Sequence, residues 1–187
     1  MALMPDEALP PFRYHPDPVR TGSVAADPDS PCLACNRLRG YIYTGPAWTG
    51  KNFNLTNAVC PWCIADGSAA KQFSAIFNDT GQIDGISQEI RDEIEKRTPG
   101  FDGWQQERWL ACCSDGASFL GVVGAAELKR DFPDAIPVVR KYLRSEFDLS
   151  KEEAEETFEA LTKDDQPSAY LFRCLHCGHY LVYADET

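Results

Sequence analysis

The chain has 187 residues, of which 43% are hydrophobic and 25% charged, a composition that excludes a fibre, a coiled coil or a disordered tail. Eighteen Lys and Arg against twenty-nine Asp and Glu give a net charge of −11, so we expect no direct binding to the phosphate backbone of nucleic acid. The N-terminal residues lack the cationic and apolar segments of a signal peptide, and no stretch reaches the roughly 18 apolar residues of a membrane span. We therefore expect a cytoplasmic protein with no membrane contact.

The first part of the chain is rich in proline. Residues 1–31 contain seven prolines, which fix φ and remove backbone donors, so we expect an extended N-terminal arm. Phe12, Tyr14 and Val19 are its candidate anchors on the core. Residues 32–187 are predicted to form a single α+β domain.

The middle of the chain mixes helical and strand patterns without a regular alternation, which favours an α+β fold with several helices around one core. Isoleucines at a spacing of four, ended by Thr98-Pro99-Gly100, mark the clearest helix. The predicted elements are a hairpin strand at 41–43, a helix over 64–73, the helix around 86–97, a strand over 101–113, and helices around 122–130 and 136–146.

The last third of the chain carries a helix start and a hairpin. Ser150 followed by Glu153 forms the pattern of a capping box, in which the two side chains bond each other's backbone amides. Ala154, Phe158 and Leu161 then give the helix one apolar face. A strand at 169–173, a turn, and a return strand at 180–183 are predicted to follow.

Cysteines carry the clearest chemical signal. Six of the eight form Cys-x-x-Cys pairs, which are Cys32/Cys35, Cys60/Cys63 and Cys174/Cys177. Two such turns complete a tetrahedral Zn(Cys)4 site, as in zinc-ribbon knuckles, whereas disulfides need an oxidising compartment. The first two pairs, 24 residues apart, therefore predict one Zn²⁺ ion. A thioredoxin-type redox pair and ordinary buried thiols are the competing interpretations.

A second Zn²⁺ is predicted at the third pair, where Gly178 suits the turn after the second cysteine. Cys112 and Cys113 are the candidates for the other two ligands. Adjacent side chains on a strand point to opposite faces, so both can bind one ion only if the backbone turns there.

Two alternatives to this ligand set stay open. His176 or His179 would replace whichever of the adjacent cysteines points away from the ion. In the other interpretation, Cys112 is only a small buried hydrophobic residue.

Enzyme signatures are weak. His15-Pro16-Asp17 before Pro31-Cys32-Leu33-Ala34-Cys35 departs from the nucleobase-deaminase pattern, because Asp replaces the catalytic Glu and a proline-rich arm separates the halves. No His-Glu-x-x-His is present. A metal-dependent hydrolase using Cys113, Cys174 and Cys177 with an open position, and a redox or stress-response adaptor with free thiols, stay as alternatives.

Most of the negative charge lies near the predicted capped helix. Nine acidic residues and two lysines between 146 and 165 give a net charge of −7. The simpler interpretation is a solvated helix face. The other is a docking surface for a basic protein partner, because one-sign patches accelerate association. Its candidate contacts are Glu152, Glu153, Glu156 and Glu159, with exposed aromatics such as Trp48 as anchors.

Four motifs in order resemble the CbrC family, which is related to a colicin-tolerance protein of enteric bacteria. They are residues 12–18 (FRYHPDP), 60–70 (CPWCIADGSAA), 104–107 (WQQE) and 172–178 (FRCLHCG). The resemblance runs over essentially the whole chain. It implies a protective protein of the immunity or tolerance type, which binds a bacterial toxin, expected to be of the nuclease type, by stoichiometric protein–protein interaction.

Overall fold

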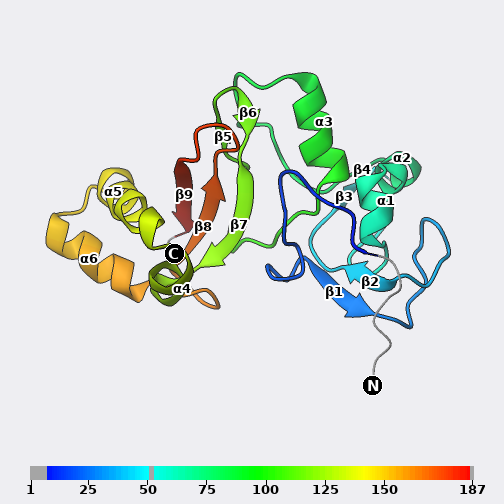
Figure 1. Cartoon of the computed structure of the whole chain (residues 1–187), viewed down its shortest axis with the longest axis horizontal. Helices are drawn as coiled ribbons and strands as arrows, with labels where there is room; N and C mark the ends of the chain where they lie inside the picture. Colours follow the sequence, from blue (N-terminus) through cyan, green and yellow to red (C-terminus); the bar gives the residue numbers. More distant parts are fainter. Residues whose placement is uncertain (1–7, 51–52, 186–187) are drawn as a thin grey trace. The chain divides into compact units, whose positions relative to one another are not determined.

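The computed structural model describes residues 8–50 and 53–185. The chain divides into two compact units, an N-terminal unit over 1–116 and a C-terminal unit over 117–187, whose elements are labelled in Figure 1. Six α-helices and four small antiparallel sheets are found among the described residues, which confirms a mixed α+β fold. The predicted division into a 1–31 arm and one 32–187 domain stays a prediction.

The N-terminal unit consists of short elements around paired strands. β1 pairs with β2, β3 with β4, and β5 with β6, all antiparallel. In chain order the elements are β1 (Val24–Asp27), β2 (Gly40–Tyr43), β3 (Trp48–Thr49), α1 (Pro61–Ala65), α2 (Ser68–Phe73), β4 (Ala75–Ile76), α3 (Gln88–Arg97), β5 (Ala111–Cys112) and β6 (Asp115–Gly116).

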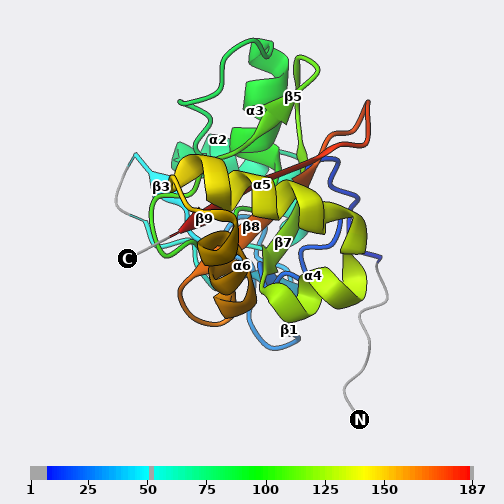
Figure 2. The same cartoon turned by 90° about the vertical axis from the view of Figure 1, so that its left-hand side faces the viewer.

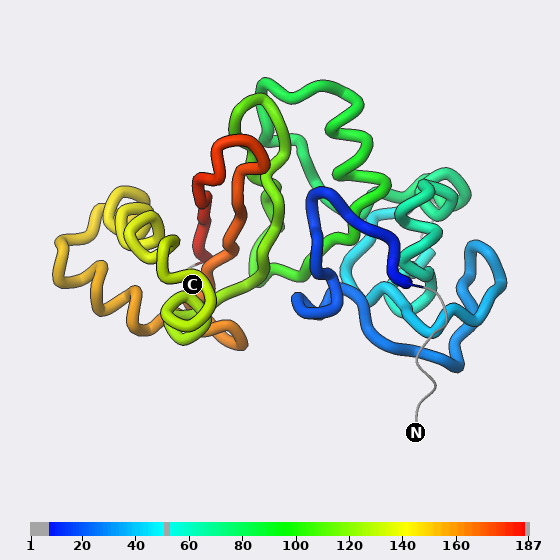
Figure 3. The backbone as a smooth tube through the Cα atoms, in the orientation of Figure 1, coloured from blue at the N-terminus to red at the C-terminus, as the bar shows by residue number. Residues whose placement is uncertain are grey.

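Residues 8–23, the described part of the segment that precedes β1, contain no helix and follow a looped path (Figure 3). Phe12 and Tyr14 are buried as predicted, and the Tyr14 hydroxyl donates to Asp115 Oδ1 at 2.6 Å. Val19 is 42% exposed, so its prediction as an anchor is wrong. His15, fully buried, is hydrogen-bonded through Nδ1 to the Pro99 carbonyl at 2.8 Å. Polar contacts therefore hold this segment as much as apolar ones do.

Two predicted elements of this unit differ in the structure. The helix over 64–73 is interrupted at Gly67, which takes φ +77° and separates α1 from α2, a conformation that favours glycine. The strand over 101–113 is reduced to β5, and the residues before it have no regular structure. The rings of Phe101 and Trp109 lie only 5.8 Å apart, whereas eight residues of an extended strand would span about 26 Å, so the chain folds back between them.

The C-terminal unit is a three-stranded antiparallel sheet in the order β7-β8-β9. Its helices α4, α5 and α6 lie on one face of this sheet, and Figure 2 views the unit from the helix side. Leu128, Leu143 and Phe158 from the helices form one core with Leu171 and Val182 from the sheet. The elements are β7 (Ser118–Val123), α4 (Ala125–Asp131), a 3₁₀ turn (Pro133–Ala135), α5 (Ile136–Glu146), α6 (Lys151–Ala160), β8 (Ser168–Arg173) and β9 (Tyr180–Asp185).

Helix predictions for this unit are confirmed over α5 and α6. The helix predicted around 122–130 begins only at Ala125, because Val122 and Val123 belong to β7. Gly124 separates the two elements, and a Cβ there would lie 2.7 Å from the Leu161 carbonyl oxygen, so only glycine fits. No helix of the residues described here is long and apolar enough to cross a membrane.

Candidate metal centres

The first four predicted ligands come together. The Sγ atoms of Cys32, Cys35, Cys60 and Cys63 all lie within 4.8 Å of one another. Cys32 and Cys63 are 3.8 Å apart and Cys35 and Cys60 are 4.0 Å apart. Four sulfurs at about 2.3 Å from a central zinc ion form a tetrahedron with edges of about 3.8 Å. The observed separations fit that tetrahedron and are far longer than a disulfide bond of about 2.05 Å.

One half of this group is a tight turn between β1 and β2. The Cys32 amide donates to the Arg37 carbonyl at 3.0 Å, and the Asn36 amide donates to the Cys32 carbonyl at 2.7 Å. Asn36 takes φ +56°, the left-handed conformation that asparagine tolerates better than most residues. The turn brings Cys32 and Cys35 to the same side as the second pair.

The other half lies at the start of α1. Cys60 is the N-cap residue and Pro61 occupies the first helical turn, where its fixed φ suits the helix and no donor is lost. The Cys60 amide donates to Cys32 Sγ at 3.2 Å. This bond links the two halves and stabilises negative charge on that sulfur.

The pKa values of three thiols in this group shift in different directions. The hydrogen bond donated by the Cys60 thiol lowers the pKa of Cys32 to about 4. The same bond, together with burial, raises the pKa of Cys60 far above its ordinary value, and burial raises the pKa of Cys63 to about 12. A bound divalent cation lowers the pKa of every thiol that contacts it, because it favours the thiolate form.

The third Cys-x-x-Cys pair forms the same kind of turn as the first. The Cys174 amide donates to the His179 carbonyl at 2.8 Å, and the Gly178 amide donates to the Cys174 carbonyl at 3.2 Å. Gly178 takes φ +72°, as its position predicts. The amides of His176 and Cys177 point at Cys174 Sγ, at 3.4 and 3.5 Å.

The adjacent cysteines lie where the backbone turns. Cys112 ends β5, and Cys113 and Ser114 take φ +55° and +58° before β6 begins, as in a two-residue hairpin turn. The reversal brings Cys112 Sγ and Cys113 Sγ to 3.7 Å, again a tetrahedral edge. The backbone therefore turns at the two adjacent cysteines, as the sequence analysis required if both were to bind one ion.

A second group of four sulfurs results. Cys112, Cys113, Cys174 and Cys177 have Sγ atoms within 4.8 Å of one another, so neither His176 nor His179 is needed to complete it. Cys113 and Cys177 are exposed, whereas three of the four sulfurs of the first group belong to buried residues. All eight cysteines belong to the described part of the chain, and none forms a disulfide. Two four-cysteine groups could thus each hold a metal ion, and all-thiolate donors suit Zn²⁺.

The four predicted docking glutamates on α6 are all exposed, but they are not equivalent. Glu153 accepts the Ser150 amide in the capping box at 2.9 Å, and Glu159 pairs with Lys129 at 2.6 Å. Glu152 and Glu156 have no ion pair among the described residues. Of the four, only Glu152 and Glu156 are without such a contact in the described part of the chain, so a partner can reach their carboxylates directly.

Comparison with known proteins places the chain in a family. The model of the uncharacterised protein family UPF0167 matches residues 9–186. The chain belongs to this family. UPF0167 proteins Mb2317 of Mycobacterium bovis and MT2352 of Mycobacterium tuberculosis are each 48% identical to it over 181 residues, which cover 96% of this chain and 94% of theirs. UPF0167 protein PA1536 of Pseudomonas aeruginosa is 38% identical over 176 residues, 92% of this chain and 95% of its own.

No solved structure matches this UPF0167 chain. The narrower resemblance to the CbrC family is consistent with UPF0167 membership and stays a prediction. Sequence reasoning missed Asn36 as the counterpart of Gly178 in the UPF0167 turns. The signal was there, because Asn is the residue that most often replaces Gly at a left-handed position.

Proposed function

We propose that the protein holds two structural Zn²⁺ ions and acts by binding a basic protein partner. The observation that carries this proposal is the pair of four-sulfur groups. A catalytic zinc keeps one coordination position for water or substrate, whereas four thiolates fill the tetrahedron. This donor set supports a structural role over the alternative of a metal-dependent hydrolase.

The acidic side of α6 supports the choice of partner. Glu152 and Glu156 are exposed, four residues apart on one helix, and have no ion pair among the described residues. The net charge of −11 adds a long-range field that steers a cationic protein towards the chain. Trp48, 42% exposed, is a candidate aromatic anchor.

The resemblance to a colicin-tolerance family supports a nuclease-type toxin as that partner. Such an enzyme is basic because it binds nucleic acid. In this proposal the chain forms a stoichiometric complex that protects the cytoplasm in which it is made. A redox adaptor remains the second candidate, because Cys113 and Cys177 are exposed.

Co-expression with a candidate nuclease toxin tests the proposal. We expect the wild-type chain to restore growth and to elute with the toxin as a complex in size-exclusion chromatography. Glu152→Gln with Glu156→Gln should slow association several-fold at low salt. Asp29→Asn with Asp84→Asn removes the same charge from exposed positions of the N-terminal unit and should change association much less. Growth arrest without any complex would refute the toxin assignment.

A further inference from the structure

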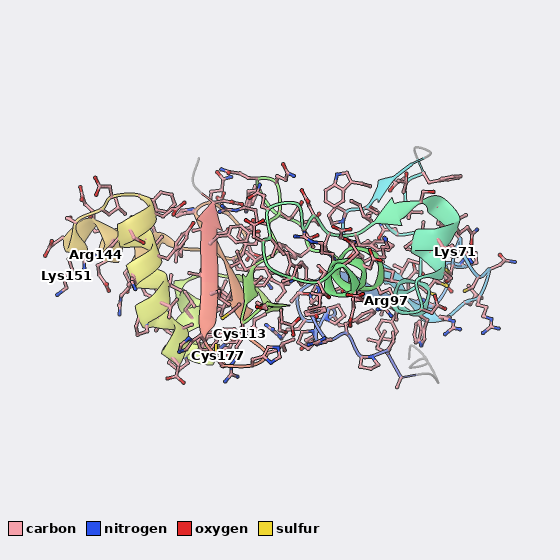
Figure 4. All side chains as sticks on the ribbon, turned by 90° about the horizontal axis from the view of Figure 1, so that it is seen from above. Lys71, Arg97, Cys113, Arg144, Lys151 and Cys177 are labelled. Carbon is pink, nitrogen blue, oxygen red and sulfur yellow. The ribbon has the colours of Figure 1, made fainter. Side chains whose placement is uncertain are left out.

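A groove between α5 and α6 is lined by cations, although the chain as a whole is acidic. The groove has a volume of about 620 Å³, within the range of pockets that bind small molecules. Four basic side chains line it, which are Arg140, Lys141, Arg144 and Lys151. Figure 4 labels Arg144 and Lys151 at this end of the C-terminal unit.

Three of these cations have no ion pair among the described residues, namely Lys141, Arg144 and Lys151. On α4, by contrast, Lys129 pairs with Glu159 and Arg130 with Asp131. Arg144 has Asp148 four residues further on, but α5 ends at Glu146 and Asp148 takes φ +51°. The helical i,i+4 pair therefore does not form, and the groove keeps uncompensated positive charge.

The fourth cation is held in place. Arg140 donates to Glu155 Oε1 at 2.6 Å, and its guanidinium lies over the Phe158 ring at 4.6 Å. Its Nε is buried and has no hydrogen-bond acceptor in the described part of the chain. A guanidinium fixed in this way loses little side-chain entropy when it binds an anion.

The remaining lining determines what kind of anion fits. Pro137, Leu149 and Ala154 supply an apolar surface, and Asp148 and Glu155 are the carboxylates among the lining residues. A long polyanion would approach the exposed Glu152 and Glu156 on the same helix, which oppose it. A compact anion fits within the groove and does not extend to these two carboxylates. Arg side chains suit phosphate because their planar donors match its oxygens.

We propose that the α5–α6 groove binds a small organic phosphate monoester. Arg140, Lys141, Arg144 and Lys151 contact the phosphate, and the apolar surface at Pro137, Leu149 and Ala154 packs against the organic group. The site is independent of the four-cysteine groups and of the partner proposed for α6. The ligand is an anion, a class of molecule that the net charge of −11 by itself would disfavour.

Titration of the zinc-loaded protein with phenyl phosphate, followed by calorimetry and by NMR chemical shifts at low salt, tests this proposal. We expect saturable binding, weakened by added salt, with shifts confined to α5 and the start of α6. Inorganic phosphate should bind more weakly because it lacks the apolar group. Benzoate, which keeps the ring but carries a single charge, should also bind more weakly.

Arg144→Gln with Lys151→Gln should weaken phenyl phosphate binding by about tenfold or more, since two charge-assisted contacts are lost. Lys71→Gln with Lys163→Gln removes the same charge from exposed positions outside the groove and should weaken it less than twofold. Both pairs change exposed side chains, and circular dichroism checks their fold. The proposal would be overturned if phenyl phosphate showed no saturable binding, or if the two double variants lost the same amount of affinity for it.

Discussion

At the scale of single residues, Cys60 links the two halves of the first four-cysteine group. Its amide bonds Cys32 Sγ at 3.2 Å, and its own sulfur lies 4.0 Å from Cys35 Sγ. We expect Cys60→Ser to lose one zinc equivalent and to unfold the N-terminal unit, because structural zinc contributes on the order of 10 kcal/mol in small modules. Zinc content and thermal unfolding measure both effects.

Cys113→Ser is the matched substitution at an exposed position of the second group. It should also lose one zinc equivalent, while the near-ultraviolet signal of the buried aromatics in the N-terminal unit persists. A Cys60→Ser protein with unchanged zinc content and melting temperature would contradict the structural role.

His15 makes stability depend on pH. Burial lowers the pKa of its imidazole from 6.5 to about 4. Between these two pH values His15 is protonated in the unfolded chain but not in the folded chain. The free energy of unfolding therefore falls as the pH falls, by about 3 kcal/mol in total. His15→Gln should remove this part of the pH dependence. Urea unfolding at pH 7 and pH 5, with zinc present, measures it, and an identical pH dependence in both proteins would show that His15 does not titrate as described.

At the scale of elements, the capping box of α6 makes a quantitative prediction. Ser150 Oγ accepts the Glu153 amide at 3.2 Å, and Glu153 Oε2 accepts the Ser150 amide at 2.9 Å. Ser150→Ala should therefore cost about 1 kcal/mol in the free energy of unfolding. Ser145→Ala, within α5 and exposed, should change it by less than about 0.5 kcal/mol. Chemical denaturation compares the two, and equal effects would mean that the cap contributes nothing.

Local signals predicted the elements whose stability is local. The capping box predicted the start of α6, and the isoleucine spacing predicted α3, because a cap and an amphipathic face are each determined by residues close together in the sequence. The strand β7 was missed, since Gly121 interrupts its pattern and the strand forms through its pairing with β8, about 50 residues later. Residues 101–110 were wrongly predicted as a strand because aromatic content alone does not provide a partner strand.

Some features of the candidate sites were likewise predictable from local sequence, and others depend on how distant segments pack. Cys-x-x-Cys spacing predicted six of the eight cysteines that the fold brings into two groups, and the adjacent Cys112 and Cys113 were the candidates left to complete the second group. The turn at Cys113 and Ser114 was only a possibility in the sequence, because Ser is not a usual residue for φ +58°. The pairing of Glu159 with Lys129 and of Arg140 with Glu155 depends on how the helices pack. For that reason neither the reduced acidic surface nor the basic groove could be predicted from charge runs.

At the scale of the whole molecule, charge and metal explain different properties. The net charge of −11 bears on which molecules approach the surface, and it contributes nothing to the fold. The four-cysteine groups contribute to folding. Many elements of the N-terminal unit have only two to six residues, and such short elements form few internal hydrogen bonds and have little stability of their own. Zinc in both groups is therefore what the fold of this chain is expected to require.

Native mass spectrometry of the purified protein, with zinc quantified in parallel, measures whether both groups are filled. Two zinc ions per chain are predicted for the wild type, and one each for Cys60→Ser, if it stays soluble, and for Cys113→Ser. A folded wild-type chain that carries no metal, with all eight thiols open to alkylation, would contradict this expectation.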